Sequence, residues 1–255
     1  MMALRSRPSD LRAVTDAAPA LSIVLPAYNE AENLPEAVAQ IRSALDAAGL
    51  DWELIAVDDG SADATGAIAD RLGAEDARVR AVRHDMNRGK GAALRTGFAA
   101  ARAPVVGYTD ADLPFDMEAL GRAYTRLVET GADMVAGYRT NRERYSLRRR
   151  IYSGTYNALV RALLGLPLDD VGFALKVMRR EVFEAADLHS DGGFADVELI
   201  ARAYRAGARI ERVGVAFTPR VRGTSTMAGP ASVAGIVRDM VRFRLGRLGA
   251  PRRTA

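Results

Sequence analysis

The chain contains no cysteine among its 255 residues, which excludes disulfide bonds, thiolate metal sites and cysteine nucleophiles. It also lacks any apolar run approaching the roughly 20 residues of a membrane-spanning helix. Residues 1–20 carry scattered charges and no hydrophobic stretch of the kind found in signal peptides. These absences predict a cytoplasmic protein without a transmembrane helix, whose chemistry relies on oxygen and nitrogen groups.

Lysine and aromatic residues are also scarce. Of the 36 lysine and arginine side chains, only Lys90 and Lys176 are lysines. Aromatic residues make up 6% of the chain. Basic clusters without interleaved aromatic rings argue against nucleic-acid binding, in which such rings stack on bases. The net charge is +4, but residues 220–255 hold eight Arg against one Asp, so the C-terminal end is the basic pole.

Apolar residues, 49% of the chain, suffice for a sizeable core and recur in alternating strand-like and helix-like patterns. Strands are predicted at residues 21–25, 52–57, 79–83, 105–108 and 133–137. Helices are predicted at residues 34–45, 62–72, 91–101, 117–129, 152–164, 195–206 and 232–245. This alternation predicts an α/β fold with a mainly parallel, twisted sheet flanked by helices, preceded by a flexible arm at residues 1–20.

Polar residues follow directly on several of these strands, where ligands bind in open α/β sheets. Asp58 and Asp59 follow the second predicted strand, and Asp110-Ala111-Asp112 follows the fourth. Two carboxylates two residues apart in an extended segment point the same way and suit a Mg²⁺ or Mn²⁺ ion shared with substrate phosphates. The alternative is an acidic turn in which the aspartates cap the next helix.

The segment 87–94, Asn-Arg-Gly-Lys-Gly-Ala-Ala-Leu, precedes a predicted helix and places Lys90 between two glycines. The glycines allow the backbone to approach a ligand closely, and a helix N-terminus favours anions, so the segment is a candidate phosphate site. It is not a Walker loop, which needs a longer glycine spacing and Lys-Ser/Thr. It is not a G-x-G-x-x-G motif either, because Leu94 stands where the third glycine belongs. An ordinary strand-to-helix turn is the alternative.

Eight segments, in this order, resemble the inverting A-type glycosyltransferases of family 2, in the branch of the dolichyl- and polyprenyl-phosphate mannose and glucose synthases. They read LSIVLPAYNEAENL, LIAVDDGSADAT, NRGKGAALRTGF, YTDADLPFD, ADMVAGYR, DDVGFALKVMRREVF, FADVELIARAYRAG and RVRGTST. The resemblance implies a single GT-A domain at residues 21–227, with a nucleotide-sugar-binding half at 21–112 and an acceptor-binding half at 113–227. Residues 228–255 then form a basic C-terminal segment.

The resemblance also implies a site for each substrate. A nucleotide diphosphosugar of the GDP-mannose or UDP-glucose type is expected at Pro26, Tyr28, Glu30, Asp58, Asp59, Lys90, Asp110, Ala111 and Asp112, with the metal at Asp110 and Asp112. The acceptor phosphate, on a polyprenyl phosphate, is expected at Arg139, Arg149, Arg220 and Ser225, and Asp112, Arg139 and Arg220 are the expected catalytic residues. Two positions depart from the mannose-synthase pattern, because Pro114 replaces a Gln metal ligand and Thr226 replaces a Lys.

In the implied reaction an acceptor phosphate oxygen attacks the anomeric carbon with inversion while the nucleoside diphosphate leaves. No strong general base is needed, because the nucleophile is already anionic. Transfer to a sugar hydroxyl is an alternative, with Asp196 or Glu198 as the base, although the helix dipole also favours acids at a helix start. A non-catalytic, nucleotide-sugar-binding scaffold at a membrane is a further alternative, prompted by Pro114 and Thr226.

Two basic regions suggest an anionic membrane surface as a partner. Residues 138–150 hold six Arg against one Glu, and the C-terminal region is the second concentration. The predicted helix at 232–245 places Val233, Ile236, Val237, Met240 and Val241 on one face, with Arg238 and Arg242 opposite. This stripe either lies among lipid headgroups at the inner face of the membrane or packs against the protein's own core.

Overall fold

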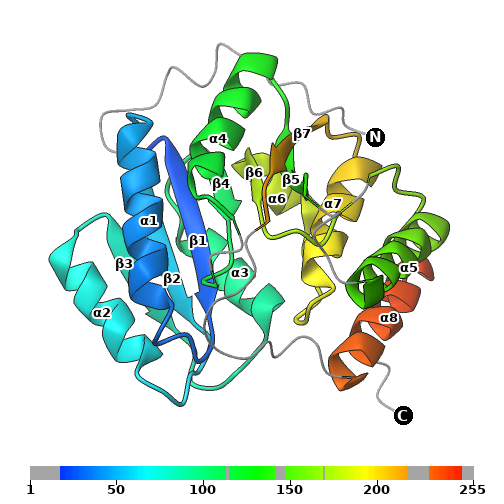
Figure 1. Cartoon of the computed structure of the whole chain (residues 1–255), viewed down its shortest axis with the longest axis horizontal. Coiled ribbons are helices and arrows are strands. Elements are labelled where there is room, and N and C mark those ends of the chain that lie inside the picture. Colours follow the sequence, from blue (N-terminus) through cyan, green and yellow to red (C-terminus); the bar gives the residue numbers. More distant parts are fainter. Residues whose placement is uncertain (1–17, 113–114, 142–146, 169, 218–229, 249–255) are drawn as a thin grey trace.

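A seven-stranded sheet runs through the part of the chain that the computed structural model describes, residues 18–112, 115–141, 147–168, 170–217 and 230–248 (Figure 1). The strands are β1 (Leu21–Ala27), β2 (Trp52–Asp58), β3 (Val79–Arg83), β4 (Val105–Tyr108), β5 (Met134–Arg139), β6 (Lys176–Arg179) and β7 (Ile210–Val215). The helices are α1 (Leu34–Ala47), α2 (Thr65–Glu75), α3 (Lys90–Ala100), α4 (Glu118–Thr130), α5 (Leu147–Leu164), α6 (Arg180–Ala186), α7 (Ala195–Arg205) and α8 (Pro230–Arg244).

The strand order is β3-β2-β1-β4-β6-β5-β7, and β6 runs antiparallel to both of its neighbours. The other neighbouring pairs, β1 with β2 and β4, β2 with β3, and β5 with β7, are parallel. Because β4 and β5 are both antiparallel to β6, they run in the same direction as each other and as β1. The carboxyl ends of β1, β2, β4 and β5 therefore open at one edge of the sheet, where ligands bind in such folds.

Helices cover both faces of the sheet (Figure 1). On one face, α1, α2 and α4 pack on residues such as Ile23 of β1. On the other face, α3 and α5 to α8 pack on residues such as Val24, the next residue of the same strand. Successive side chains of a strand point to opposite faces, so the mostly apolar β1 supplies both cores.

The α/β class, the mainly parallel sheet and its flanking helices confirm the fold expected from the sequence. Each predicted strand and helix has a counterpart, although several ends move by a few residues and α5 begins at Leu147 rather than 152. The sequence patterns missed β6, α6 and β7. β6 has four residues inside a longer apolar run, and β7 carries Glu211 and Arg212 on a half-buried edge strand, so neither shows a clear alternation.

The apolar stripe predicted for the C-terminal helix is divided between two environments. In α8, Met240 is 0% exposed and Phe243 is 5% exposed, and both belong to the core. Val237 and Val241 are 37% and 41% exposed. Core packing therefore accounts for one part of the stripe, while another part faces outward. Among the helices described, none is both long and apolar enough to cross a membrane.

Candidate active site

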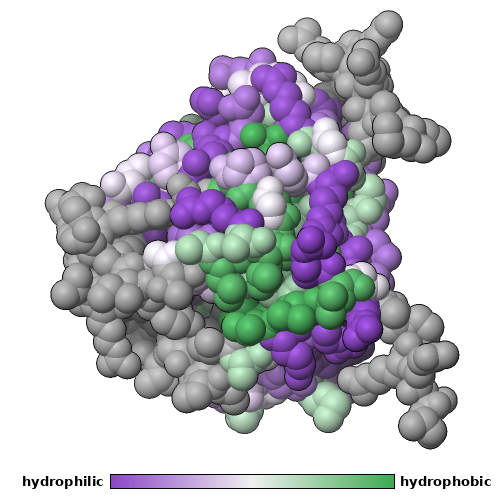
Figure 2. All heavy atoms as spheres, turned by 90° about the vertical axis from the view of Figure 1, so that its right-hand side faces the viewer, coloured by the Kyte–Doolittle hydropathy of each residue, from purple (hydrophilic) through white to green (hydrophobic). Residues whose placement is uncertain are grey.

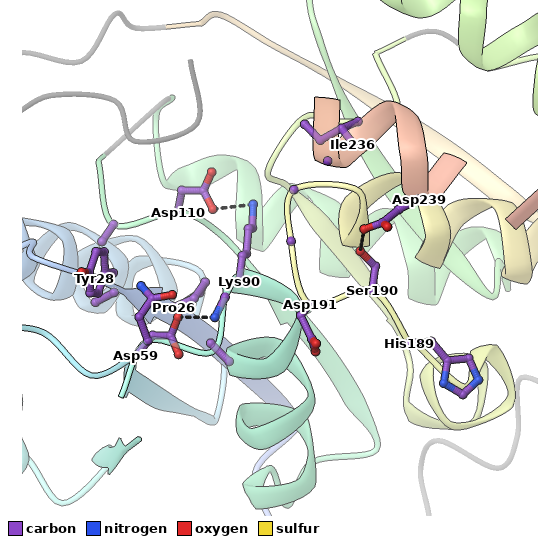
Figure 3. A pocket seen from close by; sticks show the side chains of 18 of the residues that line it. Pro26, Tyr28, Asp59, Lys90, Asp110, His189, Ser190, Asp191, Ile236 and Asp239 are labelled. Atoms are coloured by element: carbon purple, nitrogen blue, oxygen red, sulfur yellow. Dashed lines mark hydrogen bonds and ion pairs between the residues drawn. The ribbon is translucent and has the colours of Figure 1, made fainter. Parts of the chain in front are cut away.

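A cavity of about 620 Å³ opens beyond the carboxyl ends of β1 and β4 (Figure 3). One wall consists of residues that follow β1, β2 and β4, together with the start of α3. The opposite wall consists of residues 189–193, which precede α7, and of side chains from α8 and Leu248. The cavity is thus built from both the early and the late parts of the chain.

Eight of the nine residues predicted for the donor line this cavity: Pro26, Tyr28, Glu30, Asp59, Lys90, Asp110, Ala111 and Asp112. Asp58, the ninth, lies outside the lining. Its carboxylate is buried in the turn after β2, where Oδ1 accepts a hydrogen bond from the backbone N–H of Ser61 at 3.0 Å. Asp58 therefore shapes the turn that presents Asp59.

Asp59 fixes the segment that leads into α3. Its Oδ1 accepts the N–H of Arg88 at 2.9 Å, and its Oδ2 accepts the N–H of Gly89 at 2.8 Å. His84 Nδ1 lies 2.7 Å from the same Oδ1, and its Nε2 lies 2.9 Å from Thr96 Oγ1. His84 lies one residue beyond β3 and outside every predicted motif, so no sequence pattern indicates its contact with Asp59.

The two glycines beside Lys90 lie against the segment that precedes α7. A Cβ on Gly89 would clash with the carbonyl oxygen of Asp191, and a Cβ on Gly91 would clash with that of Ser190. The N–H of Gly91 also donates to the Asp191 carbonyl at 2.8 Å. Gly89 has a φ of 92°, which also favours glycine, and it lines the cavity. The chain's own residues 190–191 therefore account for a close approach at both glycines, and a ligand contact at this segment stays a prediction.

Lys90 carries a positive charge into the cavity, beside Asp110 (Figure 3). Its Nζ lies 2.7 Å from Asp110 Oδ1 and 2.9 Å from Asp196 Oδ2. Burial alone would lower the pKa of Lys90, but the two carboxylates outweigh burial and raise it above its ordinary value. Lys90 is therefore a permanent cation, positioned by Asp196 behind it and Asp110 beside it.

Neither acid proposed as a general base lies in the lining. Asp196 is 3% exposed and accepts a hydrogen bond from the Tyr108 hydroxyl at 2.6 Å. Burial would raise the pKa of Asp196, but Lys90 and then Lys176 lower it below its ordinary value. Glu198 is 0% exposed and accepts hydrogen bonds from the Ser190 N–H at 2.7 Å and from Arg202 Nε at 2.7 Å. Both acids hold neighbouring segments in place.

Asp110 and Asp112 offer oxygen ligands to a divalent cation. They do not cap α4, which begins at Glu118; the backbone N–H of Glu118 donates to Asp116 Oδ1 at 3.1 Å. In the described part of the chain, no third acidic or histidine side chain joins them in a cluster. This donor set fits Mg²⁺ or Mn²⁺, which readily complete their coordination with phosphate oxygens and water. Pro114, the departure from the expected Gln, lies outside the described residues.

Among the residues predicted for the acceptor phosphate, Arg139 is the one whose side chain the structure describes, and it does not line the cavity. The guanidinium of Arg139 lies 5.1 Å from the ring centre of Phe173 and 5.0 Å from that of Phe217. It also lies 3.7 Å from Asp170, measured from Nη1 to Oδ1. Arg139 is thus stacked between aromatic rings at the end of β5. Arg220, Ser225 and Thr226 and the side chain of Arg149 lie outside the described part of the structure.

The second wall holds residues that the sequence analysis did not place in a site: His189, Ser190, Asp191, Ile236, Asp239 and, on α8, Arg238 with Arg242. Asp239 Oδ2 lies 3.5 Å from Ser190 Oγ, which ties α8 to the segment before α7 (Figure 3). The arginines were predicted on the polar side of a helix facing a membrane. A helical pattern separates the sides of a helix, but it does not tell which side meets a distant segment.

The fold and its carboxylate-lined cavity define a ligand-binding α/β enzyme scaffold, and comparison with known proteins identifies its family. Residues 22–186 match the family model described as glycosyl transferase family 2. The match covers more than half of the chain, so the chain belongs to this family and is a glycosyltransferase. The resemblance noted in the sequence is thereby confirmed.

Three relatives show what the chain is similar to, and two of them carry a polyprenol or a prenyl phosphate in their names. The chain is 38% identical over 225 residues to glycosyltransferase AglD of Haloferax volcanii, covering 84% of this chain and 36% of that protein. It is 35% identical over 219 residues to the polyprenol monophosphomannose synthase of Mycolicibacterium smegmatis, covering 81% and 80%. It is 30% identical over 210 residues to the dodecaprenyl-phosphate galacturonate synthase of Rhizobium johnstonii, covering 80% and 61%. The chain thus spans about a third to four fifths of these proteins.

Solved structures share the GT-A fold. The glucosyl-3-phosphoglycerate synthase of Mycobacterium tuberculosis, crystallised with Mn²⁺, UDP and glucosyl-3-phosphoglycerate, matches with a TM-score of 0.67 and 23% identity, over 97% of this chain and 86% of that chain. The same enzyme crystallised with Mg²⁺ and UDP matches with a TM-score of 0.67 and 21% identity, over 98% and 86%. These matches confirm the expected fold.

Proposed function

We propose that this glycosyltransferase moves a sugar from a nucleotide diphosphosugar to a polyprenyl phosphate, with the help of a divalent cation. The observation that carries the proposal is the cavity, whose two walls bring carboxylates and cations together. Asp59, Asp110 and Asp112 line one wall with Lys90, and Arg238 and Arg242 line the other with Asp191 and Asp239. The names of the mannose and galacturonate synthase relatives support the acceptor class.

The donor binds along the first wall in this proposal. Tyr28 and Asp59 are on the side where the nucleobase and ribose are expected, since a ring can stack on a base and a carboxylate can accept its N–H groups. Lys90 pairs with the diphosphate as a fixed positive charge. Asp110 and Asp112 hold Mg²⁺ or Mn²⁺, which neutralises charge on the departing diphosphate when it is bound.

The acceptor attacks from the second wall. A phosphate oxygen forms the new bond to the anomeric carbon, the bond to the donor diphosphate breaks, and the bonding electrons leave with the nucleoside diphosphate. This reaction needs no proton acceptor, because the attacking oxygen is already anionic. Asp196 and Glu198, the two acids considered as bases for transfer to a sugar hydroxyl, are buried outside the lining, which weighs against that role for these two residues.

We further propose that α8 faces an anionic membrane surface. Val237, Val241 and Leu245 are 37%, 41% and 58% exposed along one side of α8 and its end. Figure 2 looks at the side of the molecule that carries α5 and α8, where apolar residues gather beside hydrophilic ones. Burial and the neighbouring Arg244 and Arg202 lower the pKa of Arg205, as expected for arginines crowded at one place. An anionic surface would relieve that repulsion.

The direct test incubates the protein with Mg²⁺ or Mn²⁺, a polyprenyl phosphate and one radiolabelled donor at a time, including GDP-mannose and UDP-glucose. We expect label to pass into organic solvent as a lipid-linked sugar, only with metal present and not with the matching polyprenol. Label that appears only in a water-soluble product contradicts the acceptor class. Binding of the donor without any turnover supports the scaffold alternative instead.

A further inference from the structure

We propose that Arg238 and Arg242 form a subsite for the phosphomonoester group of the acceptor. The identity of the acceptor as a prenyl phosphate rests on the proposed function, whereas the anion subsite rests on the cavity alone. The subsite faces the donor wall across the cavity and is distinct from the residues that the sequence motifs assigned to the acceptor.

The charges of the lining point to this subsite. Lys90, the cation of the first wall, is balanced by Asp110 and Asp196. The charge of Arg238 is partly balanced by Asp239, because Arg238 Nε donates to Asp239 Oδ1 at 3.0 Å. Arg242 is half-buried and lines the cavity, and no carboxylate lies within salt-bridge distance of it in the described residues. The charge of Arg242 on the second wall is therefore not balanced by a carboxylate of the described residues, and it can bind an anion.

The two arginines are placed to act together. They are four residues apart on α8, so they lie on the same side of the helix, one turn apart. A guanidinium presents several N–H groups in a planar fork that matches phosphate oxygens. Asp239 holds Arg238 and also approaches Ser190 on the facing segment, so the wall is fixed on both sides. A fixed pair of forks suits a phosphate with three exposed oxygens.

Apolar residues beside the arginines point to an acceptor with an apolar tail. Ile236 and Leu248 line the same cavity. Val241 and Leu245 are exposed, and they lie on the side of α8 next to the side that carries Arg238 and Arg242. A phosphate held by the arginines can thus extend a prenyl chain from the cavity onto the outer face of the helix.

Arg139 gives a contrast. Its guanidinium is enclosed by Phe173, Phe217 and Asp170, and it does not line the cavity. An arginine that already stacks on two rings would have to leave them to reach an acceptor. Arg242 needs no such rearrangement, which is why the subsite is assigned to α8.

The test measures binding rather than turnover. Calorimetry follows a soluble ten-carbon prenyl phosphate, the matching alcohol and inorganic phosphate, each added to the protein with a nucleoside diphosphate and Mn²⁺ bound. We compare Arg242→Gln, Arg242→Lys and Arg238→Gln with Arg244→Gln, a control on the same helix with the same change of charge. Arg238 has a side chain 67% exposed, so its replacement keeps the test valid even where Arg242→Gln does not fold.

We expect each Gln variant to raise the Kd for prenyl phosphate about tenfold or more, with Arg242→Lys in between and Arg244→Gln within about twofold of wild type. The Kd for the nucleoside diphosphate should not change. Equal prenyl phosphate affinity in all variants overturns the subsite. Variants that bind the nucleoside diphosphate more weakly, with unchanged affinity for prenyl phosphate, also overturn it. Binding of inorganic phosphate as tight as that of prenyl phosphate, with the same dependence on Arg242, supports the subsite and assigns it to soluble phosphates.

Vesicles separate a headgroup subsite from general attraction to charge. Phosphatidylglycerol vesicles with and without polyprenyl phosphate are compared at equal surface charge. A loss of binding to both kinds in Arg242→Gln, but not in Arg244→Gln, would overturn recognition of a phosphomonoester. Sugar transfer to polyprenyl phosphate with an unchanged KM in Arg242→Gln refutes the subsite and leaves the proposed function standing. If the wild-type protein transfers no sugar to polyprenyl phosphate but binds phosphate in a way that depends on Arg242, the proposed acceptor is refuted and the anion subsite stands.

Discussion

Lys90 and Asp196 meet across the boundary between α3 and α7, with 2.9 Å between Nζ and Oδ2. The pair is almost closed to solvent, since the two side chains are 12% and 4% exposed. Asp196 is thereby the anchor of a cation that reaches the cavity, and the Tyr108 hydroxyl holds the other oxygen of Asp196. The position of the cavity's charge is set by residues that a bound substrate would not touch.

Replacing Asp196 with Asn should destabilise the protein by about 3 kcal/mol, because it leaves a buried lysine with one counter-charge fewer. Urea denaturation measures the change in the free energy of unfolding. Asp191→Asn is the matched control, since Asp191 pairs with Arg95 at an exposed site and should contribute at most about 1 kcal/mol. Equal stabilities of the two variants would contradict the anchoring role.

Replacing Gly91 with Ala should destabilise the protein by more than about 1 kcal/mol and weaken nucleoside diphosphate binding, because its Cβ would meet the Ser190 carbonyl. Gly154→Ala in α5 has open space around it and should instead stabilise the protein by about 0.5–1 kcal/mol. Thermal denaturation and calorimetry follow both properties. A stable Gly91→Ala protein would mean that residues 190–191 yield easily.

Asp112→Asn should lower sugar transfer by about a hundredfold or more, if the metal contributes several kcal/mol to the transition state. Its melting temperature should stay near wild type, because the residue lies on a loop at the sheet edge. Calorimetric titration of Mn²⁺ into the protein with nucleoside diphosphate tests the metal without turnover. The control is Asp116→Asn, on the same connection but paired with Arg122 at the surface. Mn²⁺ binding retained in Asp112→Asn would remove Asp112 from the metal site.

The free energy of unfolding should rise between about pH 8 and pH 10.5 through Lys176. Burial lowers the pKa of Lys176 from 10.5 to about 8. Below pH 8 the lysine is protonated in both states; between the two values the unfolded chain binds more protons, so stability increases with pH, by up to about 3 kcal/mol. Urea denaturation at pH 7.5 and pH 10 should show a smaller rise for Lys176→Met. The same rise in both proteins would exclude Lys176 as its source.

Replacing both Val241 and Leu245 with Gln should lower binding to anionic liposomes about tenfold or more, because two exposed apolar side chains no longer enter the headgroup region. Sedimentation at low and high salt measures the binding, which should weaken as salt is raised. Val128→Gln is the control, since Val128 is 40% exposed on α4. The membrane role is contradicted by equal sedimentation of all three proteins.

Strand ends were the most predictable part of the site. Asp59, Asp110 and Asp112 each follow a buried run, and parallel strands bring such ends to one edge whatever the details of packing. The glycines of segment 87–91 were singled out because they allow close backbone approach, and residues 190–191 make such an approach. Those residues lie far along the chain from the glycines, and no local pattern records such a contact.

The second wall of the cavity could not be predicted from the sequence, for a related reason. Met240 turns to the core, Ile236 packs against the core and lines the cavity, Arg238 and Arg242 line the cavity, and Val241 is exposed. The sequence pattern separated apolar from charged residues but gave no direction to either. The four residues of the antiparallel β6 also left no clear signal in the sequence.

The contribution of α8 to the cavity has a consequence for biosynthesis. Domains fold as the chain leaves the ribosome, N-terminal parts first. The strands that carry Asp59 and Asp110 emerge early, while Arg242 and Leu248 are supplied by the last segment that the structure describes. A nascent chain arrested before α8 would therefore hold the carboxylate wall without its counterpart. It would gain the complete cavity only when residues 230–248 are released.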